Sequence, residues 1–438
     1  MKRILVLGAG LVSRPLVRYL LDEGFSVTVA SRTVSKAEAL VEGHPSGRAA
    51  EADMDRPASV EDQVEEADVV VSLLPPPMHP RVARMCLDHG KPMVTTSYLS
   101  DAMKALDGEA KEKDLVIVNE IGVDPGIDHM SAMRVIDAVH DAGGKIRSFR
   151  SYCGGLPAPE ANDNPLGYKF SWAPRGVLLA ATNPGVYQRD GKIVETPGTE
   201  IFADVHMLEV EGLGSFEAYP NRNSLGYIDL YGIPETRTMY RGTLRNPGHC
   251  ETWYKWVHFG LFDATERADL PGTPYASLMA ELAGSPEAGE AREAVSRAMG
   301  VEPAHPAVEK LSWLGLFSSD PVPPGVITVL DVLAERMLAR MRYEEGERDM
   351  IVLCHEFEAE GAGGERQRIT SRMIDFGIPG GDSSMARSVS LPAAVATARV
   401  ARGEVSERGV CIPVVRSIYE PVLEALAGLG IECEETWS

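Results

Sequence analysis

The sequence predicts an α/β protein built around a doubly wound parallel sheet, and two observations carry this prediction. First, short apolar runs, many of them β-branched, alternate with helical or loop stretches through the first third of the chain. Such runs are typical of strands that are buried on both faces, as in a parallel sheet. Second, residues 2–33 read as a strand, a glycine turn, a helix and a second strand, which is a dinucleotide-binding unit of Rossmann type.

The expected strands of this sheet follow one another with room for a helix or loop between them. They are Lys2–Leu7, Phe25–Ala30, Asp68–Leu74, Pro92–Thr95 and Leu115–Asn119, with a further short strand near Ala49–Ala52. Ligands of such sheets bind beyond the carboxyl ends of the strands. We therefore expect the functional residues in the segments that directly follow each strand.

From about Lys145 the pattern changes to an alternation of apolar and polar residues, which predicts a second, mixed α/β region. Its expected strands are Lys145–Tyr152, Ser215–Tyr219, Gly226–Tyr231 and Thr236–Thr243, followed much later by a hairpin of Asp349–Glu360 and Arg366–Phe376. Roughly residues 256–343 are rich in Ala, Leu and Glu and predict a helical insertion. A helix from Ser383, a strand over Gly409–Val415 and a helix near Tyr419–Leu429 are expected to return to the first sheet.

Three domains follow from this division. Residues 1–122 and 384–438 would form the nucleotide-binding domain of Rossmann type. Residues 123–255 and 346–383 would form a mixed α/β domain, and residues 256–345 a helical subdomain.

The glycine turn and the end of the second strand together indicate which dinucleotide binds. Gly8 and Gly10 permit a tight turn and a close approach of a pyrophosphate, but Ser13 stands where the third glycine is usual. An NAD enzyme places Asp or Glu at the end of the second strand, whereas this chain has Ser31-Arg32-Thr33. An arginine and two hydroxyls suit a 2′-phosphate, so we expect NADP(H). The alternative is an exposed basic loop on a fold that binds no nucleotide.

Net charge and the spacing of cysteines and histidines exclude several kinds of partner and site. Among 438 residues, Lys and Arg total 43 against 64 Asp and Glu, for a formal net charge of −21, which disfavours nucleic acids and anionic membranes as partners. No signal peptide or membrane-spanning run is recognised, and six cysteines lie scattered without CxxC spacing, which is typical of reduced thiols in the cytoplasm. The histidines show no metal-binding spacing, so we expect no metal.

Several sequence blocks resemble one family, the glutamate-forming saccharopine dehydrogenases, also called saccharopine reductases. The blocks are GAGLVSRPLVRYL at 8–20, TTSYLSDAM at 95–103, NEIGVDPGIDHM at 119–130, CGGLPAPEANDNPLGYKFSWAPRGVLLA at 153–180, GTLRNPGHC at 242–250 and SMARSVSLPAA at 384–394. The resemblance covers nearly the whole chain, and the 153–180 block is the most specific. Fungal members usually carry another residue at Ala173, and Asn246-Pro247 follow the Leu-Arg pair, which leaves the exact amine partner open.

The resemblance implies an enzyme of lysine metabolism that interconverts saccharopine and NADP with glutamate, 2-aminoadipate semialdehyde and NADPH. It also implies a Rossmann domain completed by C-terminal elements, a mixed α/β substrate and dimerisation domain, and a helical domain. We expect a homodimer.

Position along the predicted sheet identifies further cofactor contacts. The pyrophosphate turn, the 2′-phosphate edge and the segments after the later strands contribute Gly8, Gly10, Leu11, Val12, Ser31, Arg32, Thr33, Asp53, Met54, Leu74, Pro75, Thr96, Ser97 and Val123.

Three residues are candidates for proton transfer. Asp124 directly follows the fifth strand, where it can bind a substrate ammonium or act as a base, although Asp-Pro-Gly is also a common start of a helix. Tyr98 follows the fourth strand and can hydrogen-bond a substrate carboxylate or a carbinolamine hydroxyl; the alternative is ordinary packing. Cys153 precedes two glycines and could relay a proton, although a lone cysteine is more often a small core residue.

The substrate carries several carboxylates, for which bidentate arginines are natural partners. The resemblance implies that Arg222 and the Thr243-Leu244-Arg245 stretch hold substrate, together with Ser97, Tyr98 and Asp124. The alternative for each arginine is a solvated strand end. Lys169 and Arg175 stay unassigned.

Three rival functions remain at this stage. A carboxynorspermidine-type dehydrogenase shares the nucleotide domain but should lack the 153–180 block. A non-catalytic NADP-binding protein would need none of the substrate-binding arginines. The lysine-forming saccharopine dehydrogenase is disfavoured by Ser31-Arg32-Thr33.

Overall fold

The computed structural model describes residues 1–171, 174–285 and 287–438, and its chain divides into two compact units. The first unit comprises Met1–Ile146, Leu230–Ile233 and Leu353–Ser438, and the second comprises Arg147–Asp229 and Pro234–Val352. Ala173, where the sequence departs from the fungal pattern, lies outside the described residues.

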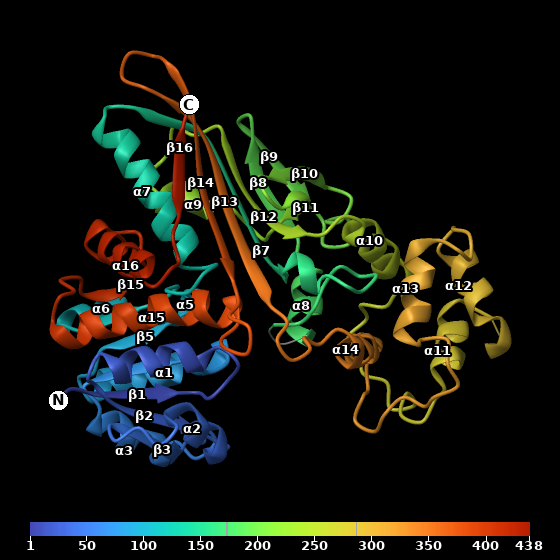
Figure 1. The fold of residues 1–438 in the computed structure, drawn as a ribbon, viewed down its shortest axis with the longest axis horizontal. Helices are drawn as coiled ribbons and strands as arrows, with labels where there is room; N and C mark the ends of the chain where they lie inside the picture. Colours follow the sequence, from blue (N-terminus) through green and yellow to red (C-terminus); the bar gives the residue numbers. More distant parts are fainter. Residues whose placement is uncertain (172–173, 286) are drawn as a thin grey trace. The chain divides into compact units, whose positions relative to one another are not determined.

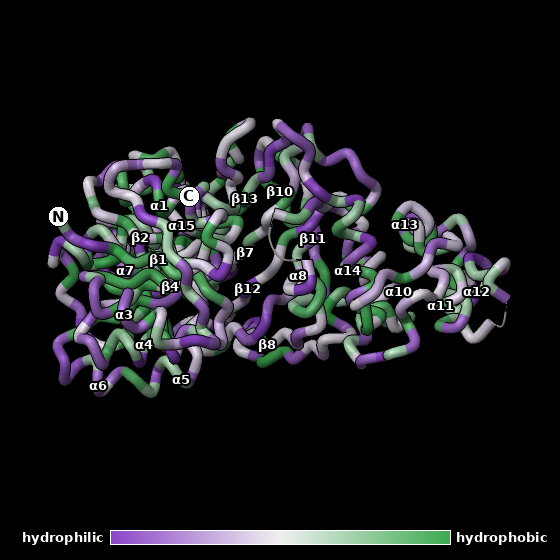
Figure 2. Tube along the Cα trace, turned by 90° about the horizontal axis from the view of Figure 1, so that it is seen from below, coloured by the Kyte–Doolittle hydropathy of each residue, from purple (hydrophilic) through white to green (hydrophobic). Residues whose placement is uncertain are grey.

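The first unit is built on a seven-stranded sheet whose pairings are all parallel. Its strands are β1 (Arg3–Leu7), β2 (Ser26–Ser31), β3 (Gly47–Glu51), β4 (Val69–Ser72), β5 (Met93–Thr95), β6 (Val116–Val118) and β15 (Gly409–Cys411). The order β15-β6-β5-β4-β1-β2-β3 reverses direction between β1 and β4, which confirms the doubly wound sheet. The central strands β1 and β4 are hydrophobic and buried along most of their length (Figure 2).

Helices cover both faces of this sheet. They are α1 (Ser13–Asp22), α2 (Val34–Val41), α3 (Ala58–Glu66), α4 (His79–Asp88), α5 (Asp101–Lys104), α6 (Asp107–Glu112), α7 (Ile127–Asp141), α15 (Ser384–Arg402) and α16 (Arg416–Gly428), with a 3-10 turn η1 (Pro76–Met78). Helix α15 packs alongside α1 (Figure 1). Strand β15 pairs with β6. The end of the chain therefore returns to the first sheet, as expected.

The first unit also carries most of a long hairpin, β13 (Asp349–Glu360) and β14 (Arg366–Phe376), whose bounds match the sequence prediction. A last strand, β16 (Glu434–Trp437), pairs antiparallel with β14. This strand was not predicted, because its four residues include only one strongly apolar side chain.

The second unit contains a mixed sheet with the order β10-β11-β12-β7, to which β8 and β9 add beside β12. The strands are β7 (Lys145–Pro157), β8 (Gly185–Arg189), β9 (Lys192–Thr196), β10 (His206–Val210), β11 (Gly214–Pro220) and β12 (Thr238–Arg245). Strand β12 runs parallel to β7 and antiparallel to β11, so both pairings occur in one sheet.

The predicted helical insertion is confirmed in the second unit. The helices of the second unit are α8 (Pro174–Ala180), α9 (Gly226–Leu230), α10 (His249–Phe259), α11 (Tyr275–Leu282), α12 (Ala291–Ala298), α13 (Pro306–Leu314) and α14 (Val329–Arg340), with 3-10 turns η2 (Pro159–Ala161) and η3 (Ala288–Glu290). Helices α8, α10, α11, α12, α13 and α14 share a core in which Trp253 and Trp256 are among the largest fully buried side chains.

One predicted strand is wrong: residues 226–230 form helix α9. The chain turns just before it, where the Asn223 side chain accepts a hydrogen bond from the Leu225 amide. The amides of Tyr227 and Ile228 then bond carbonyls three residues back, and much of the segment is open to solvent. An apolar pattern over six residues fits a strand and a helix equally well, so the local turn decided the outcome.

Candidate functional site

The glycine turn after β1 has the geometry that a pyrophosphate site needs. Gly8 has φ of 115°, and a Cβ there would come within 2.9 Å of the Leu73 carbonyl oxygen, so only glycine fits. At Gly10, by contrast, a Cβ would meet no atom within 4 Å, and the adjoining Leu11 side chain is 75% exposed. The backbone before α1 is therefore open to a ligand at the helix N-terminus.

Ser13 explains how the turn is held without the third glycine. Its hydroxyl donates to the Gly8 carbonyl at 3.2 Å and accepts from the Gly10 amide at 3.0 Å. The neighbouring Arg14 is engaged elsewhere, in an ion pair with Asp382 at 2.9 Å. The two hydrogen bonds of Ser13 thus hold the turn that close packing at a third glycine holds in the usual motif.

The edge after β2 fits a 2′-phosphate. Arg32 is exposed and forms no ion pair or side-chain hydrogen bond with any described residue, while the Ser31 hydroxyl accepts from the Thr33 amide at 3.3 Å. Asp53 lies in the electrostatic field of Arg32, but its own contacts are to the Asp55 amide and Arg56. Those contacts, led by the Asp55 amide, lower the pKa of Asp53. Met54 is buried in the core of this unit.

A histidine that the sequence analysis missed organises the ends of β4 and β5. His79, the first residue of α4, lies 2.9 Å from the Ser72 hydroxyl through Nδ1 and 2.8 Å from the Ser97 hydroxyl through Nε2. The Thr95 hydroxyl lies 3.4 Å from the same Nε2. Burial lowers the pKa of His79 to about 4, so its ring is neutral at physiological pH.

The structure joins two of the three predicted proton-transfer residues. The Tyr98 hydroxyl donates to Asp124 Oδ1 at 2.9 Å. Asp124 lies in a tight turn in which the Gly122 amide donates to the Pro125 carbonyl, and a Cβ at Gly126 would come within 2.1 Å of the Gly122 oxygen. Thr96 and Ser97 lead into Tyr98, and Val123 is buried beside Asp124 in sequence. The phenol and the carboxylate are thus held together at the carboxyl edge of the sheet.

A second buried network lies next to this pair. Glu120 accepts hydrogen bonds from the Leu99 amide at 2.7 Å and lies 2.8 Å from His129 Nε2. His129 Nδ1 lies 2.8 Å from the Tyr231 hydroxyl. Glu120 and His129 stand inside the 119–130 block, and a charged residue directly after a buried strand was the signal that could have identified them.

In the second unit, Cys153 on β7 stands opposite Thr243 on β12 in the parallel register. Cys153 is half-buried, and Thr243 also pairs with Tyr219 on β11. Arg222 follows β11 with φ of 57°, and its carbonyl accepts the Val186 amide at 2.8 Å. Arg222 itself is exposed at the end of its strand.

Arg245 is the most unusual group of the second unit. The residue is 8% exposed, and its guanidinium lies 4.9 Å from the centre of the Tyr168 ring and donates to the Leu244 carbonyl at 2.8 Å. Its Nε has no hydrogen-bond partner, and no described carboxylate forms an ion pair with it. A buried cation without an acidic partner is costly, so the site favours an anionic ligand.

The two cations that the sequence left unassigned have structural partners. Lys169 pairs with Asp163 at 2.8 Å and Glu347 at 2.6 Å, and Arg175 pairs with Asp331 at 2.8 Å. Their charges are therefore already balanced within the second unit.

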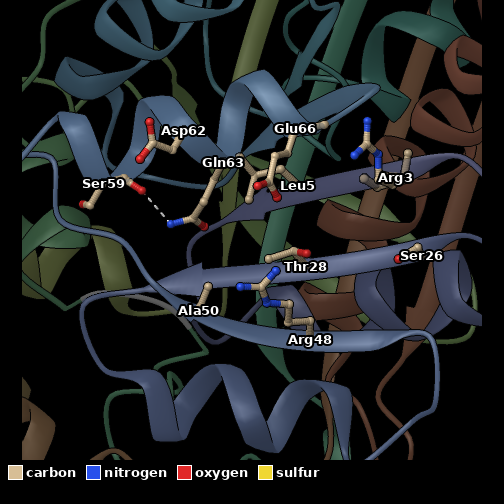
Figure 3. A pocket seen from close by; sticks show the side chains of 12 residues that line it. Arg3, Leu5, Ser26, Thr28, Arg48, Ala50, Ser59, Asp62, Gln63 and Glu66 are labelled. Carbon is tan, nitrogen blue, oxygen red and sulfur yellow. Dashed lines mark hydrogen bonds between the residues drawn. The ribbon is translucent and has the colours of Figure 1, made fainter.

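A groove of about 450 Å³ crosses the first sheet away from this edge (Figure 3). It lies beside α3, over the parts of β1, β2 and β3 nearer their amino ends, and its wall includes Arg3, Thr28, Arg48, Asp62 and Gln63. Because nucleotides bind beyond the carboxyl ends of such strands, this groove is not the candidate site. Within residues 1–171, 174–285 and 287–438, no group of His, Cys, Asp and Glu is arranged to hold a metal ion, and no helix is long and apolar enough to cross a membrane.

Comparison with known proteins finds relatives over nearly the full length of the chain. Residues 4–118 match the saccharopine dehydrogenase NADP binding domain, and residues 122–431 match the saccharopine dehydrogenase C-terminal domain. The chain is 41% identical to saccharopine dehydrogenase [NADP(+), L-glutamate-forming] of Schizosaccharomyces pombe, with 99% of each chain covered. It is also 36% identical to the mitochondrial alpha-aminoadipic semialdehyde synthase of Bos taurus, over 98% of this chain and 47% of that protein.

The fold matches a solved structure as well. The apo saccharopine dehydrogenase (L-Glu forming) of Saccharomyces cerevisiae superposes with a TM-score of 0.91 and 38% identity, covering all of both chains. Both the nucleotide edge and the mixed second sheet thus belong to one known architecture, and the chain is a member of the saccharopine dehydrogenase family.

Proposed function

We propose that this chain is an NADP-dependent oxidoreductase acting on CH–NH groups, which interconverts saccharopine with L-glutamate and 2-aminoadipate 6-semialdehyde in lysine metabolism. The observation that carries the proposal is the full-length similarity to glutamate-forming saccharopine dehydrogenases. The open glycine turn, the exposed Arg32 and the buried Arg245 support the proposal, because they suit an anionic cofactor and an anionic substrate.

NADP(H) supplies the hydride that reduces the imine or accepts the hydride in the reverse direction. Around it, the Gly8–Val12 turn receives the pyrophosphate, and Ser31, Arg32 and Thr33 hold the 2′-phosphate. The remaining contacts in this proposal are Asp53, Met54, Leu74, Pro75, Thr96, Ser97 and Val123, which follow the successive strands of the first sheet. Arg32 forms no ion pair with any described carboxylate. Its free charge favours NADP(H), which carries a 2′-phosphate, over NAD(H), which carries a 2′-hydroxyl.

For proton transfer, we assign the leading role to the Tyr98–Asp124 pair. A phenol that donates to a carboxylate keeps that carboxylate oriented, so Asp124 can bind the substrate ammonium or take its proton. Cys153 is a weaker candidate, because it is half-buried and a lone cysteine is more often a small core residue.

For substrate binding, Arg245 is assigned to a substrate carboxylate, because the ligand would neutralise a guanidinium that no described carboxylate neutralises. Thr243 and Leu244 precede it on β12, and Arg222 is the second arginine that we assign to a substrate carboxylate. In the first unit, Ser97 is a further proposed substrate contact.

We further propose that the chain forms a homodimer through its mixed α/β domain, with the domain bounds 1–122 and 384–438, 123–255 and 346–383, and 256–345. Strand β10 supports the dimer, because it is an edge strand that carries the exposed Met207. A cytoplasmic location is supported by the six cysteines, none of which forms a disulfide in the described part of the chain.

The reaction is tested by absorbance at the NADPH band with purified protein, NADP and saccharopine at mildly alkaline pH, and with NAD as the control. We expect saccharopine-dependent NADPH formation with glutamate appearing in step. Tight NADPH binding without turnover would reject saccharopine as the substrate and favour the carboxynorspermidine-type reaction. Absence of both NADPH binding and turnover would contradict the assignment of the cofactor.

A further inference from the structure

A buried chain of hydrogen bonds links three residues that have no role so far. Glu120 follows β6 at the carboxyl edge of the sheet, and its Oε2 lies 2.8 Å from His129 Nε2 on α7. The other ring nitrogen of His129 lies 2.8 Å from the Tyr231 hydroxyl, with the two rings edge to face. His129 is fully buried and Glu120 is 7% exposed. Tyr231 belongs to the four-residue segment Leu230–Ile233 that groups with the first unit.

Glu120 also binds the loop that carries Tyr98. Its Oε1 accepts the Leu99 amide at 2.7 Å, and its own amide donates to the Ser97 carbonyl at 3.1 Å. Tyr98 lies between these two contacts in sequence, and its hydroxyl donates to Asp124 at 2.9 Å. Glu120 therefore hydrogen-bonds the residues on both sides of Tyr98 in sequence. Asp124 lies four residues after Glu120 in the same loop.

The backbone of Glu120 indicates that this placement is imposed by its surroundings. Its φ is 56°, in the left-handed region that non-glycine residues seldom adopt. Such a conformation persists only where the surrounding contacts over-determine it, and it is concentrated at functional sites. A buried carboxylate also needs partners for both oxygens, and here Leu99 and His129 supply one each.

We propose that Glu120, His129 and Tyr231 form a positioning network for the reaction, which holds the Tyr98 loop so that the phenol meets Asp124. The inference rests on the roles proposed above for Tyr98 and Asp124. Small displacements of a reacting group cost rate steeply, so a rigid support behind the loop raises kcat without contacting the substrate. A purely structural network would instead affect stability and leave the turnover of the folded protein unchanged.

The test compares Glu120→Ala with Glu120→Gln in the full-length protein. The alanine variant loses the contacts to Leu99 and His129, and we expect kcat to fall by about 10- to 100-fold, with NADPH affinity unchanged. Glutamine keeps an acceptor for the Leu99 amide and a group that can bond His129, so we expect it to restore most of the lost kcat. A Glu120→Ala variant with wild-type kcat would overturn the proposal.

A matched control separates positioning from stability. His355 is, like His129, a fully buried histidine of the first unit, and its Nε2 lies 2.8 Å from the Ser131 hydroxyl. We expect His129→Gln and His355→Gln to lower the melting temperature similarly, but only His129→Gln to lower kcat. Equal kcat values for the two folded variants would contradict the positioning role. If His129→Gln does not fold, Tyr231→Phe removes only one hydroxyl and provides the same comparison.

A double-mutant cycle distinguishes this inference from the role of Tyr98 itself. If Glu120 acts through Tyr98, Glu120→Ala should have little further effect on kcat in a Tyr98→Phe background. Additive losses would overturn the proposal. A Tyr98→Phe variant with wild-type kcat would instead reject the proposed role of Tyr98, whereas loss of kcat in Tyr98→Phe but not in Glu120→Ala would reject the positioning network alone.

Discussion

At the scale of single residues, the charges of the candidate site are separated into paired and unpaired groups. Lys169 and Arg175 are neutralised by carboxylates, so their charges serve the fold of the second unit. Arg32 and Arg245 form no ion pair with any described carboxylate, one on the surface and one in the interior. Unpaired arginines are the groups that an anionic cofactor and an anionic substrate would neutralise.

The charge of Arg32 should determine the choice of cofactor. We expect Arg32→Asp to weaken NADPH binding by about 10- to 100-fold, because a charge-assisted contact to the 2′-phosphate becomes a repulsion. NADH binding should change little. Fluorescence titration with both nucleotides measures the two dissociation constants.

Arg48→Ala is a matched control for this experiment, because Arg48 is an exposed arginine on the neighbouring strand β3. It should leave both affinities unchanged. An equal loss of NADPH and NADH affinity in Arg32→Asp would mean that the 2′-phosphate binds elsewhere.

His79 should make the stability of the protein depend on pH. Burial lowers the pKa of His79 to about 4 in the folded state. As the pH falls below about 6.5, the histidine therefore becomes protonated in the unfolded chain while it stays neutral in the folded protein. This contribution is complete above pH 6.5 and is lost as the pH falls toward 4, at a cost of up to about 3 kcal/mol in the free energy of unfolding.

Urea unfolding of wild type and His79→Asn between pH 7 and 4 measures this term. We expect the variant to lose less stability on acidification than the wild type. His44→Asn is the control, since it removes a histidine outside the His79 network. Parallel stability curves for wild type and His79→Asn would refute the prediction.

At the scale of elements, a turn, a loop or a strand end provides each functional group of the first unit. The turn between β1 and α1 is the proposed phosphate site, and the loops after β5 and β6 carry Tyr98 and Asp124. Buried strands fix where these loops begin, while hydrogen bonds between loops fix where they point. Such loops tolerate strain, as the φ of 56° at Glu120 illustrates.

The two glycines of the first turn should respond differently to the same substitution. Gly8→Ala strains a φ of 115° and places a Cβ 2.9 Å from a carbonyl oxygen, so we expect a loss of about 1–3 kcal/mol in stability. Gly10→Ala meets no atom within 4 Å and should leave stability unchanged.

NADPH affinity, unlike stability, should fall in Gly10→Ala. In Gly10→Ala the methyl group occupies the space through which the pyrophosphate approaches, so we expect at least about tenfold weaker binding. Thermal unfolding and NADPH titration of both variants test the pair. A destabilised Gly10→Ala, or one that binds NADPH normally, would contradict this view of the turn.

At the scale of the whole molecule, each unit has its own hydrophobic core, and the chain crosses between the units more than once. The segments 230–233 and 353–438 rejoin the first unit after long excursions. The return of residues 384–438 was expected from the sequence, but the return of residues 230–233 was not. Local sequence pattern alone does not establish such returns, because they depend on which surfaces remain to be buried once each unit has folded.

We expect the protein to be a homodimer whose interface includes strand β10. Light scattering should give a dimer for wild type and a monomer for Met207→Glu, because a charge on this exposed edge opposes burial. Ile378→Glu, at an equally exposed apolar residue of the first unit, should remain a dimer. A wild-type protein that is monomeric at micromolar concentration would refute the prediction.

The sequence alone determined the parallel sheet, the helical insertion, the long hairpin and the family of this protein. These follow from hydrophobic period, from glycine and from short motifs, all of which are local properties of the chain. The sequence also singled out Tyr98 and Asp124 separately, since each follows a predicted strand. The strand predicted for 226–231 failed because its pattern was too short to distinguish one period from the other.

The tertiary structure alone decided which of these residues meet. It joined Tyr98 to Asp124, paired Lys169 with Glu347, and left Arg245 buried without a carboxylate. It also revealed His79 and the Glu120–His129–Tyr231 network, whose members lie up to about a hundred residues apart. Hydrogen bonds and ion pairs act over a few ångströms in space, so their partners depend on how distant segments fold together and cannot be inferred from local pattern.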